Sequence, residues 1–236
     1  MIKSILFDLD GTLRHSIPAG GDVFAEYAES LGLKISAEDR RRAARWEHYY
    51  WANSIELRAD FDKHNGESMD FWTAYARRYL VALGASSERA DELAPLVNRY
   101  MYDSYKPQNF VPPELPNVLD QLRESGYSLG VVSNRERPFT EELLQINLIH
   151  YFDLSLAAGE VDFYKPDPNI FLAALERTGA RPEQAIYVGD NYFADVIGAR
   201  RAGLVPVLYD PRGLFPDAGC DAISDFEQLF PILKRL

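Results

Sequence analysis

The length, composition and charge of the chain exclude several classes of protein. Its 236 residues suffice for one large α/β domain, or for a core with a smaller second domain, and 47% hydrophobic with 26% charged residues is ordinary for a globular protein. A net charge of -11 argues against nucleic acid or an anionic membrane surface as partners, because both need a basic face. The single cysteine, Cys220, excludes an internal disulfide bond, and no motif around it indicates a catalytic role.

The first predicted element is a strand at 2–9, a nearly continuous apolar run of the kind that is buried on both faces in parallel sheets. Two carboxylates, Asp8 and Asp10, stand at its exit and are followed by Gly11-Thr12. Because an unpaired ionised carboxylate is costly in an apolar setting, this pair indicates a site where a cation neutralises charge. The alternative is a strand that simply ends in an Asp-Gly turn.

A block of helical patterns follows a loop at 14–19. Apolar residues at helical spacing, with capping residues at the ends, predict helices at 22–31, from 36 onwards, at 69–83 and at 86–105. The segment 57–67 contains Asp60 and Gly66 and therefore predicts a loop. The block is inserted directly after the first strand and its acidic residues.

From Val111 onwards the chain alternates between helices and strands. The predicted strands lie at 127–132, 154–157, 185–188, 205–208 and 222–223. The predicted helices lie at 112–125, 140–147, 169–178, 194–202 and 225–234. This alternation is typical of βαβ units, which form a parallel sheet through right-handed crossovers.

Polar side chains follow four of the predicted strands. Besides the first pair of aspartates, Ser133 and Asn134 follow the second strand, Lys165 lies in the loop after the third, and Asp190 and Asp195 follow the fourth. Each of these has a structural explanation, as a helix cap, a solvated lysine or a first-turn acid. Ligands of such sheets, however, bind beyond the carboxyl ends of the strands, and capping alone seldom supplies suitable groups at four of them.

Together these side chains can perform one kind of chemistry. Several carboxylates with a lysine and a hydroxyl form an oxygen-rich site for a hard cation such as Mg²⁺. Mg²⁺ with lysine and hydroxyl donors can hold a phosphoryl group and stabilise its transfer. One aspartate can attack as nucleophile, and a second aspartate two positions on can protonate the leaving oxygen.

The four motifs resemble those of the haloacid dehalogenase-like hydrolases, in the same order. They stand here as Asp8-Leu-Asp-Gly-Thr, Ser133-Asn134, Lys165 in Lys-Pro-Asp-Pro, and Gly189-Asp190-Asn-Tyr-Phe-Ala-Asp195. The resemblance covers the whole chain and implies an α/β fold with a Rossmann-like parallel-sheet core. It implies that residues 1–16 and 107–236 form this catalytic core, and that 17–106 form an α-helical cap domain inserted after the first strand.

The resemblance also implies a role for each motif residue. Asp8 would be the nucleophile and a metal ligand, and Asp10 would be the general acid/base, with its backbone carbonyl on the metal. Thr12 would orient the acidic loop. The implied phosphate-binding residues are Thr12, Ser133, Asn134 and Lys165. The implied ligands of Mg²⁺, the expected cofactor, are Asp8, Asp10, Asp190 and Asp195.

The expected function is therefore that of a Mg²⁺-dependent phosphatase, acting through an aspartyl-phosphate on a small phosphorylated metabolite. The alternatives are a phosphomutase acting on a sugar phosphate, a haloacid dehalogenase and a non-catalytic phosphate-binding protein. A dehalogenase would need neither Asp10 nor the pair Asp190 and Asp195, because halide leaves without a proton or a metal. We expect a cytoplasmic location, since no signal peptide or membrane-length apolar run is recognisable. A monomer or a homodimer is expected, and the sequence does not select between them.

Substrate specificity is expected in the cap, with the segment 60–66 over the site. Arg135, which follows the second motif, is a further candidate for substrate contact. The polar and aromatic candidates in and near the cap are Arg14, His15, Trp46, His48, Tyr49, Trp51, Arg58 and His64. For Trp46 and Trp51, packing between helices is the favoured interpretation. Hinges are expected near 14–18 and 106–111.

Overall fold

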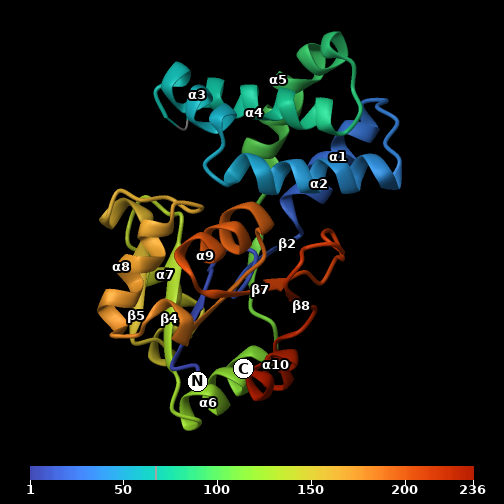
Figure 1. The fold of residues 1–236 in the computed structure, drawn as a ribbon. Helices are drawn as coiled ribbons and strands as arrows, with labels where there is room; N and C mark the ends of the chain where they lie inside the picture. Colours follow the sequence, from blue (N-terminus) through green and yellow to red (C-terminus); the bar gives the residue numbers. More distant parts are fainter. Residues whose placement is uncertain (67) are drawn as a thin grey trace. The chain divides into compact units, whose positions relative to one another are not determined.

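The computed structural model describes residues 1–66 and 68–236, and its ribbon is shown in Figure 1. The chain forms two compact units. One unit consists of Met1–His15 together with Asn109–Leu236, and the other consists of Ser16–Gln108. In the described part of the chain, no helix is both long enough and apolar enough to cross a membrane.

The discontinuous unit is built on a parallel sheet, to which six strands belong in the described part of the chain. The strands are β1 (Ser4–Phe7), β4 (Ser128–Ser133), β5 (Leu154–Ala157), β6 (Ala185–Gly189), β7 (Val205–Tyr209) and β8 (Asp221–Ile223). Their order is β5-β4-β1-β6-β7-β8, and each neighbouring pair is parallel. This is the doubly wound Rossmann order with the first strand in the centre, so the predicted α/β fold is confirmed.

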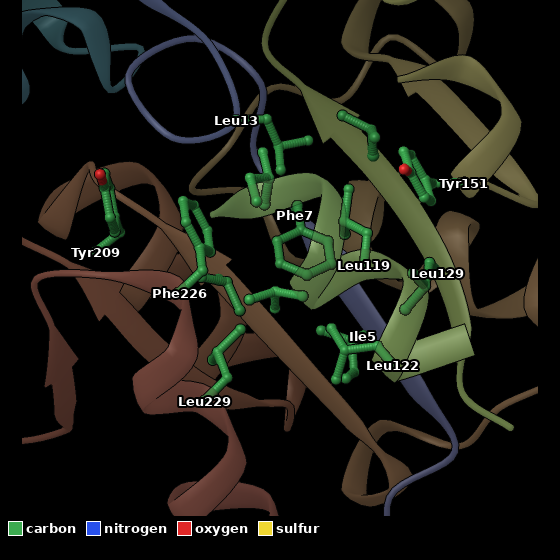
Figure 2. Close-up of a cluster of buried hydrophobic side chains, with 14 of the residues drawn as sticks. Ile5, Phe7, Leu13, Leu119, Leu122, Leu129, Tyr151, Tyr209, Phe226 and Leu229 are labelled. Atoms are coloured by element: carbon green, nitrogen blue, oxygen red, sulfur yellow. The ribbon is translucent and has the colours of Figure 1, made fainter. Parts of the chain in front are cut away.

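Helices cover both faces of this sheet. They are α6 (Leu115–Glu124), α7 (Thr140–Gln145), α8 (Pro168–Thr178), α9 (Ile197–Ala202) and α10 (Leu229–Arg235). Side chains alternate along β1, so Ile5 and Phe7 join the core shared with α6 and α10. Figure 2 shows Phe7 and Phe226 in this core. The centroids of their rings lie 6.4 Å apart. Leu6 points to the opposite core, which α8 and α9 cover.

The strand order also locates the ligand-binding edge. The chain leaves β1 towards β4 and β5 on one side, and later returns to β6, β7 and β8 on the other side. The reversal of strand order between β1 and β6 makes their carboxyl ends the expected position of a binding crevice. Residues that follow these two strands are therefore the first candidates for a functional site.

The second unit is helical. Its helices are α1 (Gly20–Ser30), α2 (Ala37–Trp51), α3 (Ile55–His64), α4 (Met69–Ala82) and α5 (Ser87–Ser104). A separate two-stranded sheet pairs β2 (His15–Ile17) with β3 (Gln108–Phe110). A capping box starts α2: Ser36 Oγ accepts from the backbone N–H of Asp39 at 3.1 Å, and the Asp39 carboxylate accepts from the Ser36 N–H at 3.0 Å.

The prediction of a loop at 57–67 is wrong for the residues that the structure describes, because α3 occupies most of the segment; Glu67 lies outside the described residues. Asp60 suggested a turn but is buried in the helix. Its carboxylate accepts two hydrogen bonds from the Arg78 guanidinium, at 2.7 and 2.9 Å, and one from the Tyr50 hydroxyl at 3.0 Å. A charged residue is tolerated in a core when it is paired in this way. The expectation that a loop at 60–66 lies over the site therefore has no support, because residues 60–64 are helical.

The aromatic residues of the helical unit pack against one another. Trp46 stacks on Tyr50 with ring centroids 5.0 Å apart, and the rings of Trp51 and Tyr75 lie 5.4 Å apart. The interpretation of both tryptophans as packing residues is therefore confirmed. Two specificity candidates are also engaged within this unit: the Tyr49 hydroxyl donates to Glu56 at 2.7 Å, and Arg58 donates to the backbone carbonyl of Asn53 at 3.0 Å.

Candidate active site

Lys165 is the centre of the polar cluster at the carboxyl edge of the sheet. Its Nζ is buried and donates to Asp8 Oδ1 at 2.6 Å, to Asp195 Oδ1 at 2.7 Å and to the Tyr187 hydroxyl at 2.8 Å. An ammonium group has three protons, so all of its donor capacity is used. Burial alone would lower the pKa of Lys165, but the carboxylates of Asp195 and Asp8 raise it well above its ordinary value. The lysine is therefore held as a cation.

The two carboxylates that pair with this lysine belong to a group of three. Asp8, Asp190 and Asp195 each offer an oxygen, and the three oxygens lie within 4.8 Å of one another. Asp8 directly follows β1, and its backbone N–H donates to Val188 of β6 at 2.9 Å, which fixes it at the reversal of strand order. Burial raises the pKa of Asp8 to about 7, although Lys165 opposes the shift. Burial, with the charges of Asp8 and Asp195, raises the pKa of Asp190 well above its usual range.

Three ionised carboxylates with a single lysine leave two negative charges uncompensated in a buried position. Such a state is unfavourable without a further cation. Carboxylate oxygens are the donors that small divalent cations prefer, so this donor set fits such an ion. The chain therefore has an acidic cluster that can hold a divalent metal.

Two glycines allow the acidic cluster to form. A Cβ added to Gly189, the last residue of β6, would lie only 2.3 Å from a carboxylate oxygen of Asp195. A Cβ added to Gly11 would lie 2.4 Å from Asp190, and Gly11 also has a φ of +92°, which favours glycine. The signature glycines thus make room for the two acids of the fourth motif.

The fourth motif is further shaped by local hydrogen bonds. Thr12 is buried, and its hydroxyl donates to Asp190 Oδ1 at 3.1 Å and accepts from the Asp190 backbone N–H at 3.0 Å. Asp195 lies in a single π-helical turn, Tyr192–Val196, and accepts from the Asn191 N–H at 2.9 Å. Such turns occur often at functional sites. Thr12, predicted among the phosphate-binding residues, therefore uses its hydroxyl to hold Asp190 in position.

Asn134 has a similar positioning contact. Its side-chain amide donates to the backbone carbonyl of Lys165 at 2.9 Å and accepts from the Lys165 N–H at 2.6 Å. This two-point pairing joins the end of β4 to the loop that carries the lysine. Ser133, the last residue of β4, is buried beside it at the same edge of the sheet. The side chain of Asn134 is therefore engaged in holding Lys165, although the sequence predicts a contact with phosphate.

Asp10 does not belong to the buried cluster. Its side chain is 42% exposed, and its two oxygens accept hydrogen bonds from Arg135 at 2.8 and 3.1 Å and from Arg14 at 2.8 Å. Of the other candidates, His15 has its ring near those of Phe110 and Tyr209, at centroid distances of 6.3 and 5.7 Å. The structure thus brings Arg14 and Arg135 to Asp10, and places His15 in an aromatic contact.

Tyr187 is a site residue that the sequence analysis does not identify. Its hydroxyl accepts from Lys165 and donates to the backbone carbonyl of Val132 at 2.7 Å, so it links the lysine to the residue before Ser133. The sequence feature that could have identified it is a single tyrosine in the apolar strand Ala185–Gly189, two positions before the glycine of the fourth motif. A buried tyrosine hydroxyl needs a partner, and the partner here is the central lysine.

The family model for haloacid dehalogenase-like hydrolases matches residues 2–203. The chain belongs to this family. Among curated relatives, a phosphoserine phosphatase of Thermus thermophilus is 34% identical, over 92% of this chain and 91% of its own length. A glyceraldehyde 3-phosphate phosphatase of Methanopyrus kandleri is 31% identical, over 100% and 99% of the two chains. A solved 2-haloacid dehalogenase from Pseudomonas syringae pv. Tomato DC3000 has a TM-score of 0.57 and 27% identity, over 100% and 99%.

Members of the haloacid dehalogenase-like hydrolase family with this fold thus include phosphatases and a dehalogenase. The fold alone does not select between these activities, because function depends on the residues of the site. The three neighbouring carboxylates beside Lys165 and the exposed Asp10 are the features on which a choice can be based.

Proposed function

We propose that this protein is a Mg²⁺-dependent phosphatase that hydrolyses a small phosphate monoester through an aspartyl-phosphate. The observation that carries the proposal is the group of three neighbouring carboxylates, Asp8, Asp190 and Asp195, of which Asp8 and Asp195 are paired with one buried lysine. A dehalogenase has no use for the extra carboxylates, since halide leaves without help from a metal. The names of the two phosphatase relatives support the same choice.

In the first half of the proposed reaction, a carboxylate oxygen of Asp8 attacks phosphorus. The new bond joins this oxygen to phosphorus while the bond from phosphorus to the leaving oxygen breaks, and Asp10 supplies the proton that the leaving oxygen needs. In the second half, Asp10 takes a proton from a water molecule that attacks the same phosphorus. Phosphate is released and the Asp8 carboxylate is restored.

The other motif residues hold charge and geometry during these steps. Lys165 neutralises Asp8 and the transferred phosphoryl group, and Ser133 binds a phosphoryl oxygen through its hydroxyl. Asn134 fixes the loop of Lys165, and Thr12 fixes Asp190, as their hydrogen bonds indicate. Positioning of this kind contributes to rate because misplaced groups lose much of their effect.

The proposed ligands of Mg²⁺ are the carboxylates of Asp8, Asp190 and Asp195, with the backbone carbonyl of Asp10. The bound ion would supply positive charge that screens the phosphoryl oxygens from the incoming carboxylate. We further propose that residues 1–16 and 107–236 act as the catalytic core of a cytoplasmic enzyme, and that 17–106 act as its cap.

The decisive experiment measures phosphate release with Mg²⁺ from p-nitrophenyl phosphate and a panel of phosphorylated metabolites. Asp8→Asn should abolish turnover and the acid-stable labelling of the protein by the phosphoryl group. Asp217→Asn, in an exposed loop, is the matched control and should keep wild-type activity. Turnover by Asp8→Asn at the wild-type rate would refute the assignment of the nucleophile.

The same panel tests Asp10. Asp10→Asn should lose most activity toward alkyl phosphates, whose leaving oxygen needs a proton, and lose less toward p-nitrophenyl phosphate. Equal losses toward both kinds of substrate would assign Asp10 a purely structural role.

A further inference from the structure

The carboxylate of Asp10 is held by three donors from two arginines. Arg135 Nε donates to Oδ2 at 2.8 Å and Arg135 Nη2 donates to Oδ1 at 3.1 Å, which is the two-point geometry of a guanidinium on a carboxylate. Arg14 Nη1 donates to the same Oδ1 at 2.8 Å. The two guanidiniums therefore form a ready-made carboxylate site, and Asp10 is the carboxylate that occupies it.

Both arginines have a second anchor that does not depend on Asp10. Arg135 Nη1 donates to Glu142 Oε1 at 2.8 Å, and Arg14 Nε donates to Asn109 Oδ1 at 3.0 Å. These contacts keep the guanidiniums oriented when Asp10 moves. The site is thus preorganised, which lowers the cost of binding another carboxylate there.

The pairing of Asp10 with the arginines conflicts with its proposed role. An oxygen that exchanges a proton with the leaving group must face that group, whereas both oxygens of Asp10 face guanidiniums. Ion pairs of partly exposed side chains contribute little stability, so this pairing is readily exchanged. When Asp10 turns to the leaving group, three charged donors lose their carboxylate, and a second carboxylate is the acceptor that matches their charge and two-point geometry.

We propose that Arg135 and Arg14 bind a carboxylate of the substrate, so that the natural substrates are phosphate monoesters that also carry a carboxylate. This inference rests on the proposed phosphatase function. Arg135 follows Ser133 by two residues, and its guanidinium contacts Asp10, the residue that would exchange the proton with the leaving oxygen. The carboxylate of the substrate replaces that of Asp10 on the arginines and frees Asp10 to face the leaving oxygen. Arg135 is then a specificity-determining residue.

The test uses substrate pairs that differ in the carboxylate. Phosphoserine is compared with phosphoethanolamine, and 3-phosphoglycerate with glyceraldehyde 3-phosphate, by kcat/KM with Mg²⁺. The wild-type enzyme should prefer the carboxylated member by about ten-fold or more, as expected for charge-assisted hydrogen bonds. Arg135→Met should reduce this preference to about two-fold or less. Arg135→Lys keeps the positive charge but cannot make the two-point contact of a guanidinium, so it should retain only part of the preference.

The measured quantity is the ratio of kcat/KM for the carboxylated substrate to kcat/KM for its partner. A purely structural role of Arg135 would lower both values together and leave this ratio unchanged. Arg181→Met, which removes an exposed arginine whose ion pair is with Glu183, two residues on in the sequence, is the matched control and should keep the wild-type ratio. A wild-type ratio near one, or an unchanged ratio in Arg135→Met, would overturn the inference while phosphate release from p-nitrophenyl phosphate still upholds the proposed function. Absence of release from every ester would refute both.

Discussion

The two charged clusters at the carboxyl edge of the sheet use the same chemistry in opposite environments. Around Lys165 the lysine and its two carboxylate partners are at most 9% exposed, and every proton of the ammonium has an acceptor. Around Asp10 the paired side chains are 19–42% exposed. Breaking an ion pair in the buried cluster leaves an uncompensated buried charge and costs several kcal/mol. In the partly exposed cluster, water screens the charges, so an ion pair can be replaced at little cost. The cluster of Lys165 is therefore suited to holding charge in a fixed position, and the cluster of Asp10 is suited to the exchange of acceptors that we propose.

The largest expected difference between the two clusters is tested with Lys165→Met. Removal of the lysine leaves Asp8 and Asp195 buried without their cation, so the free energy of unfolding should fall by about 3–5 kcal/mol. Activity should fall by about 10³-fold, because the charge on the transferred group loses its compensation. Arg14→Met, in the exposed cluster, should cost about 1 kcal/mol or less in stability. Urea unfolding in EDTA measures both variants, and similar losses would show that the two clusters do not differ.

A second test uses pH and metal on the buried cluster. The folded, metal-free protein has the Asp8 pKa raised to about 7, above the unfolded value of 3.8, so the folded state binds the extra proton. Stability without metal should therefore fall as the pH rises from about 4 to about 7. Stabilisation by Mg²⁺, which displaces that proton, should be larger by a few kcal/mol at about pH 8 than at about pH 5. Thermal unfolding with Mg²⁺ and with EDTA checks this, and Asp190→Asn should reduce the difference.

The variant with the smallest expected effect, Tyr187→Phe, removes a single hydroxyl from the buried cluster. Tyr187→Phe keeps the ring but deletes the hydroxyl between Lys165 and Val132, so kcat should fall about ten-fold while KM changes by less than about two-fold. Tyr151→Phe, whose hydroxyl interacts with Asp120, is the control and should leave kcat unchanged. Steady-state kinetics distinguishes the two variants. A change in KM alone would assign Tyr187 to substrate binding.

The buried cluster could be predicted from the sequence to a large extent. Apolar runs identify the strands, and parallel strands bring their carboxyl ends to one edge, so Asp8, Lys165 and Asp190 had to lie near one another. The contacts of Thr12 and Asn134 could not be predicted in the same way. A hydroxyl or an amide beside a phosphate site can bind the ligand or bind the protein, and only the coordinates distinguish the two.

The exposed cluster and the helix α3 were harder to predict for a different reason. Asp10 and Arg135 are 125 residues apart, and no periodic pattern relates surface charges across such a separation. In α3, the acid and glycine that favour a loop locally were overridden by the bonds of Asp60 to Arg78, eighteen residues away. Tertiary pairing of this kind outweighs the small energies of local propensity.

The central position of β1 has a consequence for how the protein is made. Both neighbours of β1 in the sheet, β4 and β6, lie beyond the helical unit in the sequence. During synthesis the first strand therefore leaves the ribosome long before either partner exists, whereas helices such as α4 and α5 find their contacts close by along the chain. The proposed nucleophile, Asp8, is therefore translated before both strands that flank β1, and its site cannot form until β6 has been made.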